Sequence, residues 1–177
     1  RQARGAHRGV SALEPAVALR GLLHRRRALT VSRDVGMPRG AYTCAMDVQR
    51  MVIYGVSFDV VGKQPIVLLK TVEGNRFLPI WIGHPEAAAI LLRIQGTKLP
   101  RPMTHDLLAG IIDTLEAEIA RITVTELRES TFYAQLTLLK DGAEIEVDSR
   151  PSDALALAVR TDAPIFASTE LLDENGI

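Results

Sequence analysis

The sequence predicts an α+β fold, in which three main helices and a largely antiparallel or mixed sheet of about seven strands form a single domain. Two observations carry this prediction. Short runs rich in β-branched and aromatic residues are separated by turn signals, which is typical of strands joined as hairpins. Three other segments have the start signals and apolar spacing of helices. Only the last helix and strand resemble a parallel crossover.

Three strands are expected first. Residues 51–61 are rich in valine, isoleucine and aromatic side chains, and residues 62–65 form a turn that contains glycine and proline. Residues 66–71 and 76–82 are the next two strands. The loop at 72–75 contains the Gly and Asn that tolerate positive φ, which favours a hairpin.

Two helices should follow. The first spans residues 85–94, because Pro85 fits a first helical turn and Gly96 is a stop signal. The second begins after Thr104, which we expect to be its N-cap. Apolar residues then recur at helical spacing and predict an amphipathic helix; they are Leu107, Leu108, Ile111, Ile112, Leu115 and Ile119.

The remaining segment contains four strands and one helix. Asp141-Gly142 is a strong hairpin signal, and Pro151 opens a helix that continues to Val159. Ser168 or Thr169 should cap a short terminal turn. The strands are expected at residues 122–127, 131–139, 143–148 and 163–167.

Composition narrows the class of protein. The chain has 177 residues, of which 47% are hydrophobic and 24% charged, as is normal for a soluble globular protein. The longest uninterrupted apolar run has 6 residues, whereas a transmembrane helix needs about 20. No membrane partner is therefore expected. Cys44 is the only cysteine, so an intramolecular disulfide is impossible, and we predict a reducing, cytoplasmic location.

The net charge of zero conceals two oppositely charged segments. Residues 1–46 contain 9 arginines and 2 acids, a balance of +7, whereas residues 47–177 contain 12 basic and 19 acidic residues, a balance of −7. We interpret residues 1–46 as a mostly disordered basic leader and residues 47–177 as the folded domain. The leader is interpreted as a nucleic-acid or lipid-binding arm, a transit peptide, or a stretch upstream of a true start at Met46 or Met51.

The first candidate cluster lies at the start of the second helix. His105 and Asp106 supply an acid/base or metal-binding pair, and Arg101 supplies a phosphate clamp. A simpler alternative is that Thr104 caps the helix and Asp106 interacts with the helix dipole. His105 is then an ordinary surface residue.

The second cluster lies between a strand and the third helix. Arg150 and the hydroxyl of Ser152 would strengthen phosphate binding at the positive end of this helix. Asp153 would compete for the same positive end. In the structural alternative, Ser149 or Ser152 caps the helix and Pro151 orders its first turn.

A third pattern concerns carboxylates on a strand. Glu144, Glu146 and Asp148 alternate with apolar residues and therefore share one face of the strand. Such carboxylates could converge on a hard divalent ion. We favour the alternative, in which they form a polar solvent-facing side over an apolar core side.

Three ordered motifs resemble the bifunctional nuclease domain family of bacteria and plants. They are FLPIWIG at Phe77–Gly83 with EAAA at Glu86–Ala89, RPMTHDL at Arg101–Leu107, and SRPSDALALA at Ser149–Ala158. The resemblance covers about residues 51–166. It implies a compact α+β domain, nuclease activity on RNA and DNA as in characterised relatives, and self-association into a homo-oligomer.

The leading functional hypothesis is therefore a nuclease that hydrolyses phosphodiester bonds of RNA and DNA. His105 is the expected acid/base, because the ordinary pKa of histidine is about 6.5. Asp106 and Asp153 are the catalytic carboxylates, and Mg²⁺ or Mn²⁺ is the expected cofactor. Stabilisation of the phosphate charge is assigned to Arg101 or Arg150.

The alternative hypothesis is a non-catalytic, oligomeric regulatory or ligand-binding module. The charge of the domain favours it, since a balance of −7 repels a polyanion. The position of the candidate residues discriminates the two hypotheses. Convergence in one cleft favours the enzyme, and separate positions at the ends of separate helices favour the module.

Overall fold

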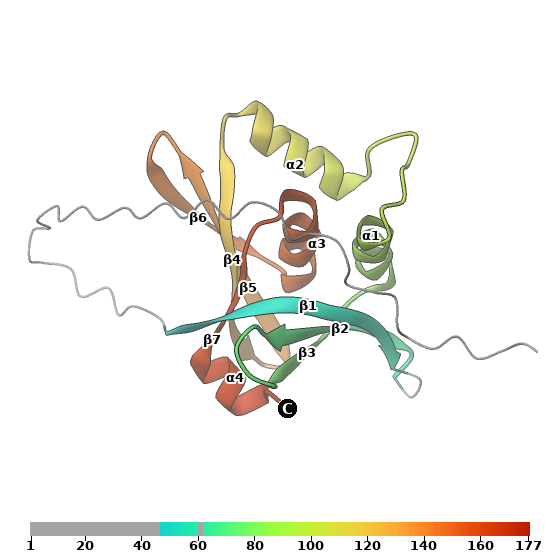
Figure 1. Cartoon of the computed structure of the whole chain (residues 1–177), viewed down its shortest axis with the longest axis vertical. Helices are drawn as coiled ribbons and strands as arrows, with labels where there is room; N and C mark the ends of the chain where they lie inside the picture. Colours follow the sequence, from blue (N-terminus) through green and yellow to red (C-terminus); the bar gives the residue numbers. More distant parts are fainter. Residues whose placement is uncertain (1–46, 60–61) are drawn as a thin grey trace, which may run out of the picture. The chain divides into compact units, whose positions relative to one another are not determined.

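The computed structural model describes residues 47–59 and 62–177 (Figure 1). The basic leader, residues 1–46, lies outside the described residues, as do Val60 and Val61 at the end of the first predicted strand. The prediction that the leader is disordered is therefore not addressed by the structure. Within the described ranges no helix is long and apolar enough to span a membrane.

The described residues form the predicted α+β fold around one seven-stranded sheet. The strand order is β3-β2-β1-β7-β4-β5-β6, and all pairs are antiparallel except β4 with β7. The sheet is therefore mixed, with its parallel pair at the predicted crossover. The strands are β1 (Val48–Asp59), β2 (Gln64–Thr71), β3 (Phe77–Trp81), β4 (Glu118–Arg128), β5 (Thr131–Lys140), β6 (Ala143–Ser149) and β7 (Ile165–Ser168).

Four helices accompany the sheet. They are α1 (His84–Ile94), α2 (Thr104–Thr114), α3 (Pro151–Thr161) and α4 (Thr169–Asn175). Figure 1 shows α1, α2 and α3 gathered on one side of β1, with α4 on the other side. Helix α3 contacts both α1 and α2 and lies over β4 and β5. Helix α1 also contacts β2 and α2 contacts β4, so α3 is the central helix of this layer.

Buried and partly exposed residues alternate along the strands, and the buried ones form one half of the core. In β2, Val67 and Leu69 are buried while Leu68 between them is partly exposed, as expected for a strand with one covered face. Helix α3 supplies the other half of the core with Leu155 and Leu157, both fully buried. Its alternating alanines carry small side chains, which allow the helix to lie close to the sheet.

Two tight turns position residues that matter below. Asp141 and Gly142 have φ of 51° and 77°, so the predicted hairpin between β5 and β6 is confirmed. Glu129 and Ser130, between β4 and β5, also have positive φ, at 49° and 61°. This conformation matches the twist of a hairpin, although neither residue is a glycine.

Helix α2 differs most from its prediction. It ends at Thr114, and Ile119 is a buried residue of β4 instead of a helix residue. The apolar spacing continued across this boundary because a strand residue and a helix residue can both face the same core. The apolar side of α2 is also largely exposed: none of its residues is fully buried, and only Ala109 and Ile112 pack against the core.

The predicted helix caps are corrected in two places. Met103 is the N-cap of α2 and Thr104 is its first residue, and the Asp106 carboxylate accepts the Met103 N–H at 2.8 Å. Arg150 is the N-cap of α3, so neither Ser149 nor Ser152 caps it. The cap expected at Ser168 is confirmed, since its hydroxyl accepts the N–H of Leu171 at 3.1 Å.

Candidate functional site

The first turns of α1, α2 and α3 meet at one cluster of charged side chains. Glu86 comes from α1, His105 from α2 and Asp153 from α3, and Arg150 immediately precedes α3. Pro151 fixes the first turn of α3 because its φ suits a helix and its missing N–H is not needed there. The backbone of Arg150 is therefore extended, and its side chain can turn back over the helix start.

Arg150 joins two carboxylates from different helices. Its Nε donates to Asp153 Oδ2 at 2.7 Å, and its Nη2 donates to Asp153 Oδ1 at 3.1 Å. The same Nη2 also donates to Glu86 Oε1 at 3.0 Å. Its Nη1 donates to no other described residue, and the side chain is 67% exposed. Arg150 is thus held in place while one donor nitrogen faces solvent.

His105 completes the cluster. Its Nε2 lies 3.0 Å from Asp153 Oδ1, and its side chain is only 12% exposed. Because an ionised carboxylate only accepts hydrogen bonds, Nε2 carries the hydrogen and is the donor of this hydrogen bond. In a neutral ring the other nitrogen, Nδ1, then has a free lone pair. Asp153 therefore selects the tautomer of His105.

The charged state of Asp153 follows from its partners. Burial raises the pKa of its carboxyl, but hydrogen bonds from Arg150 and His105 outweigh burial, and the net pKa is lowered. The hydrogen bonding that Arg150 donates to Asp153 is also the main cause of the raised pKa of Arg150. Asp153 is consequently an anion and Arg150 a cation at neutral pH.

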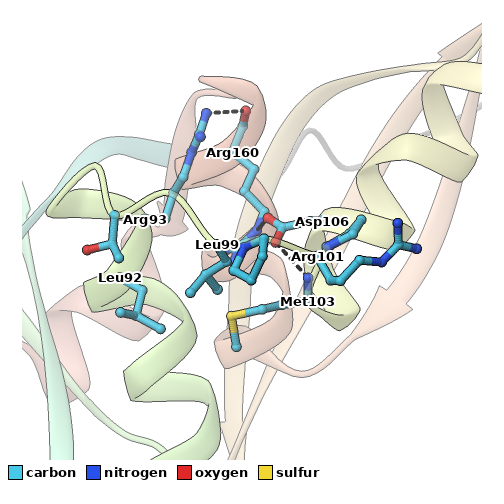
Figure 2. A pocket seen from close by; sticks show the side chains of 10 residues that line it. Leu92, Arg93, Leu99, Arg101, Met103, Asp106 and Arg160 are labelled. Carbon is cyan, nitrogen blue, oxygen red and sulfur yellow. Dashed lines mark hydrogen bonds and ion pairs between the residues drawn. The ribbon is translucent and has the colours of Figure 1, made fainter.

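A second charged cluster is formed by Arg160 and Asp106 (Figure 2). Arg160, on the last turn of α3, donates from Nε to Asp106 Oδ1 at 2.6 Å and from Nη1 to the Ala156 carbonyl at 2.7 Å. A third donor, Nη2, reaches the Ala89 carbonyl of α1 at 3.3 Å. With a side chain only 5% exposed, Arg160 is fully enclosed and hydrogen-bonded. It joins α1, α2 and α3 and has a structural role.

Asp106 is held in its charged form. The backbone N–H of Met103 is the main cause of its lowered pKa; burial acts in the opposite sense, and Arg160 lowers the pKa further. Its two oxygens bind Met103 and Arg160 separately. Asp106 is therefore occupied at both oxygens by contacts that fix the start of α2.

The sequence-predicted site residues fall into two groups. His105, Asp153 and Arg150 are directly bonded, and Arg150 and Ser152 line a cavity of about 320 Å³. Arg101 and Asp106 line a different cavity of about 290 Å³, together with Arg93 and Arg160. Figure 2 shows the guanidinium of Arg101 pointing away from Asp106. The structure thus brings three of the six residues into one bonded cluster and does not place all six in one cleft.

The carboxylates of β6 are engaged in ordinary surface contacts. Glu144 accepts two hydrogen bonds from Arg121, at 3.0 and 2.9 Å, and Glu146 accepts one from Gln135 at 2.8 Å. These carboxylates are solvent-exposed, as expected, but the apolar core side expected beneath them was wrong, because Ile145 and Val147 are exposed as well. Across residues 47–59 and 62–177, no three His, Cys, Asp or Glu side chains are grouped as a metal site would require.

These helix starts lie within a match to a known family. The sequence model of the bifunctional nuclease domain matches residues 67–177, which include α1, α2 and α3 and more than half of the chain. The chain belongs to the bifunctional nuclease domain family. The resemblance inferred from the three motifs is thereby confirmed.

Relatives of this bifunctional nuclease domain occur in bacteria and plants. An uncharacterised protein of Mycobacterium tuberculosis is 40% identical over 125 residues, which cover 71% of this chain and 74% of that protein. Bifunctional nuclease 1 of Arabidopsis thaliana is 28% identical over 117 residues, or 64% and 36% of the two chains. Bifunctional nuclease 1 of Oryza sativa subsp. japonica is 26% identical over 115 residues, or 63% and 35%. The match thus covers about a third of each plant protein.

Sequence reasoning missed two residues of the bifunctional nuclease domain that the structure places at these clusters. Glu86 was considered only as part of a sequence motif, yet it pairs with Arg150 across 64 positions of sequence. Arg160 was not singled out. Its signal was available, because residues seven apart, such as Asp153 and Arg160, return to the same side of a helix. On an otherwise apolar helix, two charged residues on the same side indicate that polar groups of a neighbouring element face that side.

The Asp106–Arg160 contact should make stability depend on pH. The folded-state pKa of Asp106 is lowered, so its contribution is present above the unfolded value, about 3.9, and is lost as pH falls through the folded value. Asp106→Asn should therefore lower the urea unfolding free energy at neutral pH, and the difference from wild type should shrink below about pH 4.

Asp113→Asn on the same helix is the matched control, because Asp113 is exposed and makes no ion pair with a described residue. It should leave the unfolding free energy nearly unchanged at both pH values. A destabilisation by Asp106→Asn that is equally large in acid would show that the charge of Asp106 is not what stabilises the domain.

Proposed function

We propose that this protein is a nuclease that hydrolyses phosphodiester bonds of RNA and DNA at the cluster of His105, Asp153 and Arg150. One observation carries the proposal: an imidazole, a carboxylate and a partly exposed guanidinium from two helix starts are joined by hydrogen bonds of 2.7 to 3.1 Å. The family membership and the plant relatives called bifunctional nucleases support it.

His105 acts as the general base. Asp153 accepts a hydrogen bond from the Nε2–H of His105. The lone pair of Nδ1 is therefore left to remove a proton from a water molecule. The water oxygen forms a bond to phosphorus, the bond from phosphorus to the leaving oxygen breaks, and the leaving oxygen takes up a proton from the imidazolium or from solvent. Asp153 also stabilises the imidazolium formed during the reaction.

Arg150 stabilises the negative charge on the phosphate. Its Nη1 is free to donate, while Nε and Nη2 are fixed on carboxylates. A donor that is already oriented needs no rearrangement when charge develops in the transition state. Glu86 therefore acts as a positioning residue, because it holds the guanidinium on the side opposite to the substrate.

The cofactor is a separate part of the proposal. Mg²⁺ or Mn²⁺ would supply Lewis-acid stabilisation of the phosphate. The described carboxylates and imidazoles form no group with the composition of a metal site, so the described residues offer an ion no ready set of three such ligands. Cleavage that disappears in chelator and returns with added Mg²⁺ or Mn²⁺ would establish the requirement.

His105→Asn should lower kcat/KM for oligonucleotide cleavage about 10²- to 10⁴-fold, because general acid–base catalysis is lost. The assay uses the full chain, freed of host nucleases, with single-stranded and duplex RNA and DNA. Cooperative thermal unfolding of the variant would show that the fold is retained.

His84→Asn is the matched control, because His84 also lies at a helix start but contacts Phe58 and not the cluster. It should cleave as wild type does. Arg150→Lys should lower kcat/KM, and Arg121→Lys, which alters a similar exposed pair with Glu144, should not. Equal cleavage by wild type, His105→Asn and Arg150→Lys would indicate a contaminating nuclease and contradict the proposal.

A second candidate function, an oligomeric module, is favoured by the exposed side of α2. Leu107, Ile111 and Leu115 recur at four-residue intervals and are all exposed, and Leu108 beside them is exposed too. Such a side is apolar and carries no charge, so two copies related by a two-fold axis can cover each other. We propose that a second copy of this chain occupies it.

Ile111→Asp should convert the oligomer into a monomer, since a buried unpaired carboxylate at the centre of this side is costly. Sedimentation velocity at several protein concentrations measures the change. Asp113→Ala on the same helix should leave the association unchanged. A wild-type chain that sediments as a monomer at all concentrations would contradict the proposed interface.

A further inference from the structure

A cavity of about 320 Å³ opens beside Arg150, where four separate segments of the chain meet. The start of β2 contributes Gln64, the end of β3 contributes Trp81, the turn between β4 and β5 contributes Ser130 and Thr131, and the start of α3 contributes Pro151 and Ser152. Its size lies at the lower end of the range for small-molecule pockets, about 300–1,000 Å³. It is suited to one small ring system.

Trp81 is the most prominent feature of this cavity. It lies at the end of an edge strand, is 50% exposed, and is the only tryptophan in the chain. The neighbouring residue Ile80 occupies the core position and is buried. Because strand residues alternate between the two faces, Trp81 lies on the side of β3 opposite to the buried side chain of Ile80, and it is one of the residues that line the cavity.

The chemistry of the lining indicates an uncharged planar ligand. Trp81, Phe132 and Pro151 provide flat apolar surfaces, and Gln64, Thr131 and Ser152 provide groups that donate and accept hydrogen bonds. Arg150 is the only charged residue of the lining, and two carboxylates already compensate it. The inner cavity therefore suits an uncharged ring with polar edges better than a second phosphate.

We propose that this cavity is a binding subsite for one unpaired nucleobase, which stacks on Trp81 while the adjoining phosphate lies at Arg150. The inference rests on the proposed nuclease function, because Arg150 belongs both to this cavity and to the His105–Asp153 cluster. A base inside a duplex is already stacked and paired, and its extrusion costs a few kcal/mol. The subsite therefore selects unpaired strands.

The position of Trp81 provides a direct measurement. Since the chain has one tryptophan, its fluorescence reports on this cavity alone. Titration of the full chain with oligodeoxythymidine of about ten nucleotides, in chelator and with a check that the oligonucleotide stays intact, should quench the fluorescence to saturation. A duplex of the same length should cause little quenching.

Trp81→Ala should weaken binding of the fluorescein-labelled oligonucleotide about five- to 150-fold, which is the range for loss of one stacked base. Trp81→Phe should weaken it less, because a smaller ring still stacks. Tyr54→Ala is the matched control: Tyr54 is an exposed aromatic residue of β1 that contacts Phe77 and does not line the cavity. It should bind within twofold of wild type.

The salt dependence of the affinity distinguishes binding at this subsite from charge attraction by the basic residues 1–46. Affinity of the full chain should fall with salt, but the ratio between wild type and Trp81→Ala should stay constant, since stacking neutralises no phosphate. Unchanged fluorescence at saturation, equal affinity of wild type and Trp81→Ala, or a Trp81→Ala effect on oligomeric state instead of binding would each overturn the proposal.

The two proposals fail separately. If cleavage depends on His105 but binding is unchanged by substitution of Trp81, only the base subsite is overturned. If binding depends on Trp81 but cleavage is unchanged by substitution of His105, only the nuclease assignment is overturned. If the full chain binds neither strand form, both are overturned.

Discussion

The arrangement of the helices depends on the carboxylate of Asp153. It binds Arg150 and His105 at once, and through Arg150 it is linked to Glu86, so that one anion connects the starts of three helices. Helix α2 needs this connection because none of its residues is fully buried. The hydrophobic effect holds α3 on the sheet, whereas α2, of which only Ala109 and Ile112 pack against the core, is also held against α3 by polar contacts to Asp153 and Arg160.

The same contacts account for the proposed chemistry. A carboxylate that is kept ionised by two donors fixes the tautomer of His105 and the direction of Arg150. Each donor lies on a regular element or at its first turn, so its position is set by helix geometry and not by a loop. A site built in this way is preorganised, because the side chains that react are already held by the contacts that stabilise the fold.

Much of the fold could be predicted from the sequence, because hairpin turns and runs of β-branched residues are local signals. The hairpin at Asp141-Gly142 and the strand expected at residues 66–71 are both confirmed. The candidate residues of α2 and α3 were also found from local motifs. Their pairing was not predictable, since Glu86, His105 and Asp153 come together only through packing of separate helices. The exposure of Leu107 was missed because an apolar spacing indicates a helix face but not what covers it.

The central claim is that His105 and Arg150 act as one unit through Asp153. A double-mutant cycle on kcat/KM for cleavage of a single-stranded oligonucleotide, with His105→Asn, Arg150→Lys and the combined variant, tests it most directly. Groups that act together are strongly non-additive, so the combined variant should be about as slow as the slower single variant. Losses that multiply, or variants as active as wild type, would contradict the account.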